Sequence, residues 1–213
     1  MSDFTKDLIV MVADNDAQLA VEELLKRHQS MGIRKIDYDM IRHPQRDSGC
    51  RGKPEALLRG FSNTHQYALV IFDHHGSGRD NLPVASVESE TRELLRRNGW
   101  CDRAEVVVIA PELETWMWSD SPEIDRVFGW QAKQPTLRDW IHRQGLTDQP
   151  ESKPGDPKET YHRAVREVGK AVSASHFKEL AKTVSFRRCS DPSFTRFLDI
   201  LKNWFNQTTS PDS

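Results

Sequence analysis

The chain has 213 residues, and its 30 Lys and Arg nearly balance 32 Asp and Glu, which gives a formal net charge of −2. This length suits one domain of about 100–200 residues, with room for an appendage. No apolar run approaches the ~20 residues of a membrane span, the first apolar run lacks a basic leader, and three cysteines without a CxxC pair indicate neither a disulfide framework nor a zinc knuckle. We therefore expect a soluble cytoplasmic protein with no membrane partner.

Four segments are expected to form β-strands. Residues 7–13, 67–72 and 106–110 are continuous apolar runs, which are typical of strands buried on both faces of a parallel sheet. Residues 35–41 alternate between polar and apolar, which is typical of a half-exposed strand.

Helical patterns separate these strands. Residues 17–28 keep the spacing of a helix after Asp16, a good N-cap residue. Residues 87–98 form another helical pattern that stops at Gly99, where a C′ glycine is expected. The alternation of strand and helix predicts the α/β class, with a doubly wound, mostly parallel sheet of about four strands.

The second half of the chain has a different character, because strand signals end after Trp118. Residues 145–157 are polar and rich in proline, which predicts a loop. Helices are expected over residues 157–174, 177–183 and 192–205. We predict an α/β domain over residues 1–120, a C-terminal helical extension over 121–206 that packs on it, and a disordered tail over 207–213.

Acidic side chains follow three of the four predicted strands. The first strand runs into Asp14 and Asp16, the third into Asp73, His74 and His75, and the fourth into Glu112 and Glu114. Adjacent carboxyl ends of a parallel sheet meet at one crevice, and a divalent cation relieves repulsion between carboxylates gathered there. Oxygen ligands suit Mg²⁺ or Mn²⁺, and an added imidazole favours Mn²⁺. The predicted metal ligands are Asp14, Asp73, His75, Glu112 and Glu114.

Some of these acids also have a simpler interpretation. Asp14 or Asp16 suits the N-cap of the following helix, and Glu112 suits a first helical turn, where it would face the positive end of the helix dipole. Three strands that all end in acids are harder to explain in this way, and they favour a metal or phosphate site.

Two motifs resemble those of the DHH phosphoesterases. The tripeptide at residues 73–75 is DHH, and residues 14–17 (DNDA) follow the first strand. That family binds two Mn²⁺ ions with a first-strand DxD and a later DHH. This chain has no glycine- and histidine-rich C-terminal motif, and its two motifs are closely spaced for that fold.

A second resemblance covers nearly the whole chain. The first strand with its acidic turn, the strand ending in D-x-x-G-x-G at residues 73–78 and the strand ending in E-L-E-x-W at residues 112–116 resemble the Toprim domain. The likeness is to the small Toprim-like proteins that are related to the OLD nucleases and occur in phage-defence loci. Residues 153–159 and 188–194 resemble the C-terminal part of that group.

The Toprim resemblance implies a nuclease or phosphodiesterase that depends on Mg²⁺ or Mn²⁺. It implies nucleic acid as a partner, with DNA favoured over RNA, and a place beside other proteins of a prokaryotic anti-phage defence system. Asp73, Glu112 and Glu114 match the acids of the family best. Asp14 would assist them, and Lys153 or Lys158 would neutralise charge in the transition state.

Two positions depart from the Toprim pattern. Ala13 stands where the family has Glu, and His75 stands where it has the second acid of the DxD pair. The near-zero net charge also gives no overall basic field for nucleic acid. The alternative function is therefore a catalytically degenerate Toprim module that binds partner proteins or nucleic acid in a defence complex.

Overall fold

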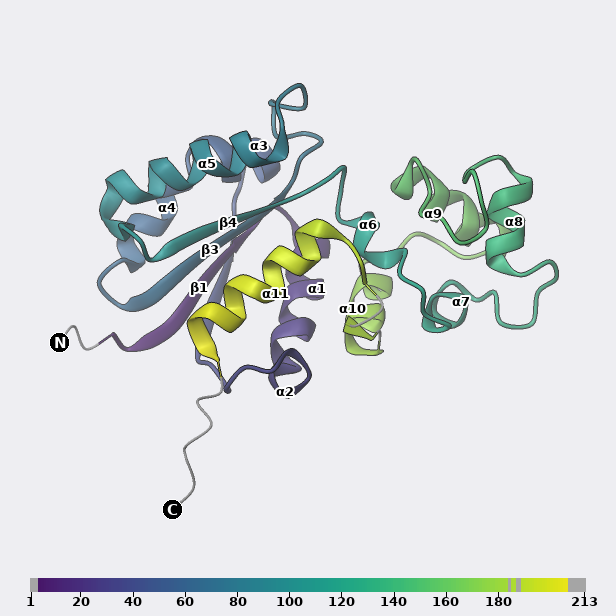
Figure 1. Ribbon diagram of the computed structural model, residues 1–213, viewed down its shortest axis with the longest axis horizontal. Coiled ribbons are helices and arrows are strands. Elements are labelled where there is room, and N and C mark those ends of the chain that lie inside the picture. Colours follow the sequence, from purple (N-terminus) through teal and green to yellow (C-terminus); the bar gives the residue numbers. More distant parts are fainter. Residues whose placement is uncertain (1–3, 184, 187–188, 207–213) are drawn as a thin grey trace, which may run out of the picture.

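A parallel four-stranded sheet forms the centre of the molecule, in a computed structural model that describes residues 4–183, 185–186 and 189–206 (Figure 1). The strands are β1 (Lys6–Val12), β2 (Tyr38–Arg42), β3 (His65–Asp73) and β4 (Ala104–Ile109), in the order β2-β1-β3-β4. All neighbouring strands are parallel. The α/β prediction is confirmed. The tail over residues 207–213, for which we predicted disorder, lies outside the described residues. Arg188, the first residue of the segment 188–194, also lies outside them.

The strand order creates a switch point in the sheet. After β1 the chain moves to one side to form β2, and then returns to the other side of β1 to form β3 and β4. Connections therefore leave β1 and β3 in opposite directions, and a crevice opens between them at their carboxyl ends, where open α/β sheets bind ligands.

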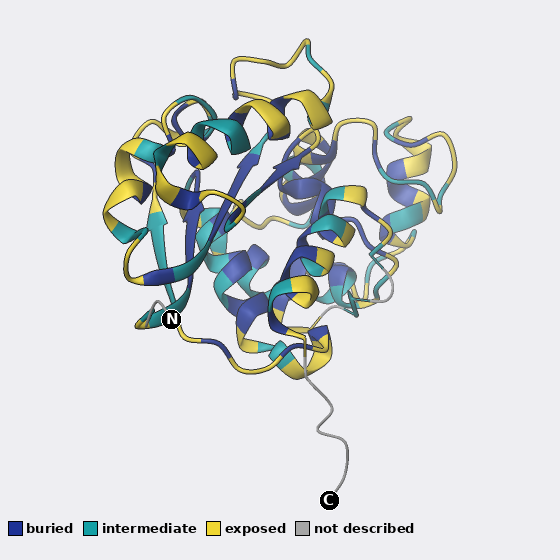
Figure 2. Cartoon of the chain, turned by 60° about the vertical axis from the view of Figure 1, so that its left-hand side comes forward, coloured by how far each residue is buried: buried dark blue, intermediate teal, exposed yellow. Residues whose placement is uncertain are grey.

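Helices cover both faces of the sheet (Figure 1). One face carries α3 (Arg46–Gly52), α4 (Glu55–Leu58) and α5 (Val84–Leu95), and the other carries α1 (Asn15–Lys26), α10 (Ala174–Thr183) and α11 (Pro192–Phe205). Side chains alternate along a strand, so Ile9 packs toward the first face and Val10 toward the second. Both are fully buried, which explains the continuous apolar runs; Figure 2 shows the strands as a buried layer between helices with exposed outer surfaces.

The C-terminal helices share a core with the sheet. The chain leaves β4 through α6 (Glu114–Met117) and forms α7 (Glu123–Phe128), α8 (Leu137–Arg143) and α9 (Pro157–Glu167), which lie to one side of the sheet (Figure 1). Trp118, Phe128 and Tyr161 belong to the same buried cluster as Val10 of β1. Among the described residues, no strand follows β4, and no helix has the length and apolar character needed to cross a membrane.

Several helix boundaries differ from the predicted ones. Helix α1 begins at Asn15 because the N-cap is Asp14, not Asp16. Helix α5 begins and ends three residues before the predicted limits, and a π-helical turn (Arg96–Trp100) follows it, in which Gly99 has a φ of 95°. Helix α9 ends at Glu167 because Gly169 has a φ of 71°, and α10 starts afresh at Ala174.

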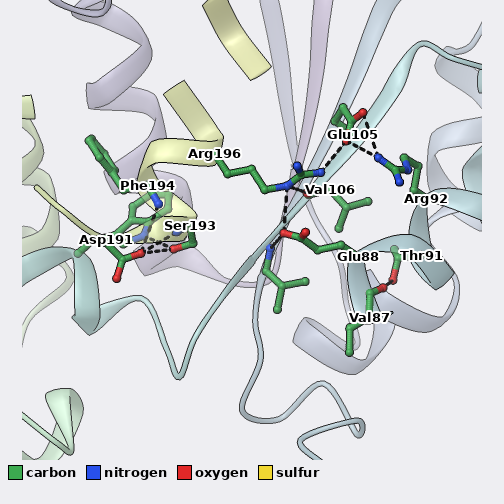
Figure 3. Close-up of polar contacts among 12 residues, drawn as sticks. Val87, Glu88, Thr91, Arg92, Glu105, Val106, Asp191, Ser193, Phe194 and Arg196 are labelled. Carbon is green, nitrogen blue, oxygen red and sulfur yellow. Dashed lines mark hydrogen bonds and ion pairs between the residues drawn. The ribbon is translucent and has the colours of Figure 1, made fainter. Parts of the chain in front are cut away.

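Side chains cap the outer edge of β4, the last strand of the sheet (Figure 3). Glu88 of α5 accepts a hydrogen bond from the Val108 amide at 3.1 Å. Arg196 of α11 donates to the Val106 carbonyl oxygen at 3.0 Å and to the Glu105 carboxylate at 2.8 Å. These contacts satisfy peptide groups that an edge strand otherwise leaves unpaired, and they fix α11 to β4.

Candidate metal centre

Three carboxylates converge at the carboxyl edge of the sheet. Asp73 is the last residue of β3, and Glu112 and Glu114 follow β4. Each of the three offers one oxygen, and these oxygens all lie within 4.8 Å of one another. Glu112 and Glu114 are buried, and Asp73 is half-buried. These are the three acids that match the Toprim pattern best.

Backbone hydrogen bonds hold the two acidic turns side by side. The His74 amide donates to the Ile109 carbonyl oxygen at 2.8 Å, and the His75 amide donates to that of Pro111 at 3.0 Å. The turn after β3 therefore continues the pairing of β3 with β4 beyond the sheet. This pairing places Asp73 next to the turn that carries Glu112.

Burial and mutual repulsion perturb these carboxyl groups. Burial raises the pKa of Asp73 well above its ordinary range, and the charges of Asp47, Glu114 and Asp14 raise it further. Burial also raises the pKa of Glu114 to about 7; the charge of Lys158 opposes this shift, and that of Glu112 adds to it. The cluster therefore carries more negative charge than its surroundings balance, which is the condition that a bound cation relieves.

Asp14 lies beside this cluster and caps α1. Its Oδ1 accepts hydrogen bonds from the amides of Asp16 and Ala17, both at 3.0 Å. The capping role considered for it is therefore present. Its charge also raises the pKa of Asp73, so it adds to the negative potential at the crevice.

The helix that follows β2 contributes a further acid, which sequence reasoning missed. Asp47, in α3, accepts a hydrogen bond from the Asp73 amide at 2.9 Å. Burial raises its pKa, and the charge of Asp14 adds to the shift. Asp47 stands five residues after β2, in a segment without helical or strand periodicity, so the only available signal was its place after a strand.

Lys158 is the basic residue that reaches the cluster. It is the second residue of α9, and its Nζ donates to Glu112 Oε2 at 2.5 Å and lies 3.9 Å from Glu114 Oε1. It can therefore neutralise part of the negative charge, or charge that develops on a bound group.

Lys153 and His74 have other partners, and His75 lies at the rim of the cluster. Lys153 Nζ donates to Asp191 and to the Thr115 carbonyl oxygen, and not to any of the three clustered acids. His75 is at the rim, with its side chain 69% exposed and its Nδ1 3.9 Å from Glu112 Oε1. His74 Nε2 faces the Leu82 carbonyl oxygen at 3.0 Å, in the loop that follows β3.

An open hollow beside Asp14 adds a basic surface to the crevice. It lies between the carboxyl ends of β1 and β2, and its lining includes Asn15, Gln18, Arg42 and Arg46. Both arginines are exposed, and Arg46 has a φ of 49°, in the left-handed region that non-glycine residues seldom occupy. Guanidinium groups in such a place can bind phosphate oxygens.

Comparisons of this chain with protein-family models, with curated proteins and with solved structures give no match. The resemblances to the Toprim and DHH families therefore remain predictions from sequence motifs. The geometry of the crevice is what supports a function for this chain.

Proposed function

We propose that this chain is a nuclease or phosphodiesterase that depends on Mg²⁺ or Mn²⁺. The observation that carries the proposal is the convergence of Asp73, Glu112 and Glu114 at the carboxyl ends of β3 and β4, next to the switch point, with oxygens within 4.8 Å of one another. No described residue donates a hydrogen bond to the Asp73 carboxylate, so its oxygens are free for a cation. Carboxylate oxygens are the donors that these two ions prefer, and the residues therefore fit the metal.

Different residues of the chain would have different roles around the ion. Asp73, Glu112 and Glu114 would hold it, with Asp14 and the exposed His75 assisting from the edge. A bound divalent ion supplies charge to polarise the scissile phosphate and to lower the pKa of the attacking water. Lys158, already within reach of Glu112 and Glu114, would neutralise charge that develops on the phosphate oxygens.

We propose nucleic acid as the substrate, with DNA favoured over RNA. Arg42 and Arg46 support nucleic acid as the substrate, because they line an open hollow that meets the acidic crevice at Asp14; the preference for DNA rests on the Toprim resemblance. The two arginines supply the local positive charge that the whole chain, at a net charge of −2, does not supply. The proposed place in an anti-phage defence system, with other defence proteins as partners in the cytoplasm, rests on the Toprim and OLD resemblance alone.

A specific contact favours a second candidate function, a module that binds nucleic acid or a partner protein without cleavage. The ion pair between Lys158 and Glu112 balances part of the cluster's charge from within the chain. His75 in place of an acid would also reduce the number of hard ligands.

One experiment separates the two candidates. Plasmid DNA and short single strands are incubated with the protein in Mg²⁺ or Mn²⁺, with EDTA controls. Cleavage that is lost in Asp73→Ala and Glu114→Ala but kept in Asp199→Asn, which changes an exposed acid of α11, supports the enzyme. Metal binding without cleavage supports the module, and the absence of both contradicts the metal-site proposal.

A further inference from the structure

Glu114 belongs to helix α6, which is too short to be stable without contacts to the rest of the chain. Helix α6 is a single turn of four residues, all of them buried, and its N-cap residue Leu113 provides no side-chain hydrogen bond. An isolated turn of this length is unstable, because one turn fixes several backbone dihedrals for very few hydrogen bonds. The position of the Glu114 carboxylate therefore depends on the contacts that α6 makes with the rest of the chain.

Beside the Lys158–Glu114 ion pair and a hydrogen bond from Thr115 Oγ1 to the Ala110 carbonyl oxygen, two side-chain contacts tie α6 to the start of α11. Lys153 Nζ donates to the carbonyl oxygen of Thr115, the residue that follows Glu114, at 3.2 Å, and to Asp191 Oδ2 at 3.1 Å. Trp116 Nε1 donates to Ser193 Oγ at 2.8 Å. Both contacts lead from α6 to the first turn of α11.

Several hydrogen bonds fix the start of α11. Asp191 is 5% exposed and caps α11, and its Oδ1 accepts hydrogen bonds from Ser193 Oγ at 2.5 Å and from the amides of Ser193 at 3.0 Å and Phe194 at 3.3 Å (Figure 3). Further along the same helix, Arg196 binds the edge of β4 and lies 3.1 Å from Glu88 (Figure 3). The carboxylate of Asp191 therefore connects α6, through Lys153, to a helix that is fixed on the sheet.

We propose that Lys153 and Asp191 are positioning residues, which hold α6 so that the Glu114 carboxylate stays within reach of Asp73 and Glu112. Lys153 contacts none of these three acids, and acts on Glu114 through the neighbouring carbonyl group. This role deepens the proposed function and rests on it, because it needs a metal bound at the three carboxylates.

The chain offers a matched control for Lys153. Lys133 Nζ also donates to one carbonyl oxygen and one carboxylate, those of Glu167, at 3.0 and 2.9 Å. Its side chain is 31% exposed, against 29% for Lys153. Lys133→Met therefore controls for the loss of a similarly exposed lysine; because its partner Glu167 is 45% exposed and Asp191 is 6% exposed, a double variant controls for the larger destabilisation in Lys153→Met.

The test is the affinity of the intact protein for Mn²⁺, measured by titration calorimetry. Loss of a residue that orients a metal ligand commonly weakens metal binding by about 10–100-fold, so Lys153→Met should fall in this range. Lys153→Arg, which keeps the charge and the donors, and Lys133→Met should both stay within about threefold of the wild type, since neither leaves α6 without its support.

A double variant distinguishes positioning from mere stabilisation. If Lys153 acts through Glu114, then Glu114→Gln and Lys153→Met remove the same interaction, and the double variant should bind Mn²⁺ no more weakly than Glu114→Gln alone. Each of these variants should also raise the water proton relaxation of bound Mn²⁺, because a water replaces the lost carboxylate. Lys133→Met should leave the relaxation unchanged.

Each outcome decides the proposal. No Mn²⁺ binding by the wild type overturns the proposed function together with this inference. The positioning role is overturned, and the metal site left intact, by either of two results. In the first, the wild type binds Mn²⁺ and the affinities of Lys153→Met and Lys133→Met are equal. In the second, the effects of Lys153→Met and Glu114→Gln on Mn²⁺ affinity are additive. If Lys153→Met does not fold, Asp191→Asn keeps a capping oxygen and removes the partner charge of Lys153; unchanged Mn²⁺ affinity and relaxation in that variant overturn the role equally.

Discussion

Replacing Glu114 by Gln should stabilise the protein in the absence of metal, in a manner that depends on pH. In the folded chain the pKa of Glu114 is about 7, against an ordinary value of 4.5, and burial is the main cause. The folded state therefore binds more protons than the unfolded state between these two values. The free energy of unfolding of the wild type falls as the pH rises through this window, because the ionised carboxylate is unfavourable in the fold.

The expected size of this effect follows from the pKa shift. Each unit of difference corresponds to about 1.36 kcal/mol. The Glu114 side chain is 8% exposed, so solvent screens it little. With pKa values of 4.5 in the unfolded chain and about 7 in the folded chain, ionisation of Glu114 lowers the free energy of unfolding by about 1 kcal/mol at pH 5 and by about 3 kcal/mol at pH 8, relative to a side chain that stays neutral. Glu114→Gln keeps the shape and cannot ionise, so it should recover these amounts.

The difference in the free energy of unfolding between Glu114→Gln and the wild type is measured by urea denaturation in EDTA, followed by circular dichroism, at several pH values between 5 and 8. Asp199→Asn removes an exposed acid and serves as the control, with a small change that does not grow with pH. A Glu114→Gln variant that is less stable than the wild type at pH 8, or whose difference from it is constant with pH, would refute the reasoning. Such a result would mean that Lys158 stabilises the carboxylate fully and that no repulsion is left for a metal to relieve.

Four further changes test other parts of the structure. Asp73→Asn should raise the melting temperature in EDTA and weaken Mn²⁺ binding, because it removes a repelling charge; a melting temperature several degrees lower would make Asp73 a structural hydrogen-bond partner. His75→Asp should shift metal preference from Mn²⁺ toward Mg²⁺ and make Mn²⁺ binding persist to lower pH than in the wild type, since an imidazole must be neutral to bind metal; calorimetry that gives parallel pH profiles and unchanged affinities would remove His75 from the ligand set. Arg46→Ala should weaken the binding of single-stranded DNA, measured by fluorescence anisotropy, at unchanged Mn²⁺ affinity; equal DNA affinity would exclude the hollow as a phosphate site. Glu88→Ala leaves the Val108 amide unpaired and should cost about 1–3 kcal/mol in urea denaturation, whereas a loss near zero would mean that water satisfies the amide.

The buried strands were the most predictable part of the fold. The apolar runs at residues 7–13, 67–72 and 106–110 predict strands, because a strand covered by helices on both faces needs apolar side chains at every position. Strands β1, β3 and β4 overlap these runs. The parallel arrangement then allowed the meeting of Asp73, Glu112 and Glu114 to be expected from three separate strand ends.

Tertiary contacts decided what sequence patterns could not. Lys153 lies in the proline-rich segment over residues 145–157 and Lys158 directly follows it, so the two are equal candidates by sequence. The structure pairs Lys158 with Glu112, 46 residues away, and Lys153 with Asp191, 38 residues away. Helix α3, which carries Asp47, has two glycines in seven residues and lacks a helical pattern. Its place is set by packing against the sheet, where Cys50 is buried.

The most direct test of the proposed metal centre is the binding of Mn²⁺ to the wild-type protein at pH 7.5, measured by titration calorimetry in two buffers of different ionisation enthalpy. We predict specific binding that Asp73→Asn and Glu114→Gln each weaken and Asp199→Asn does not. Protons should be released on binding, because the pKa of Glu114 lies at about 7 without metal. The absence of binding heat with both Mn²⁺ and Mg²⁺, or binding that Asp73→Asn and Glu114→Gln leave unchanged, would contradict the account.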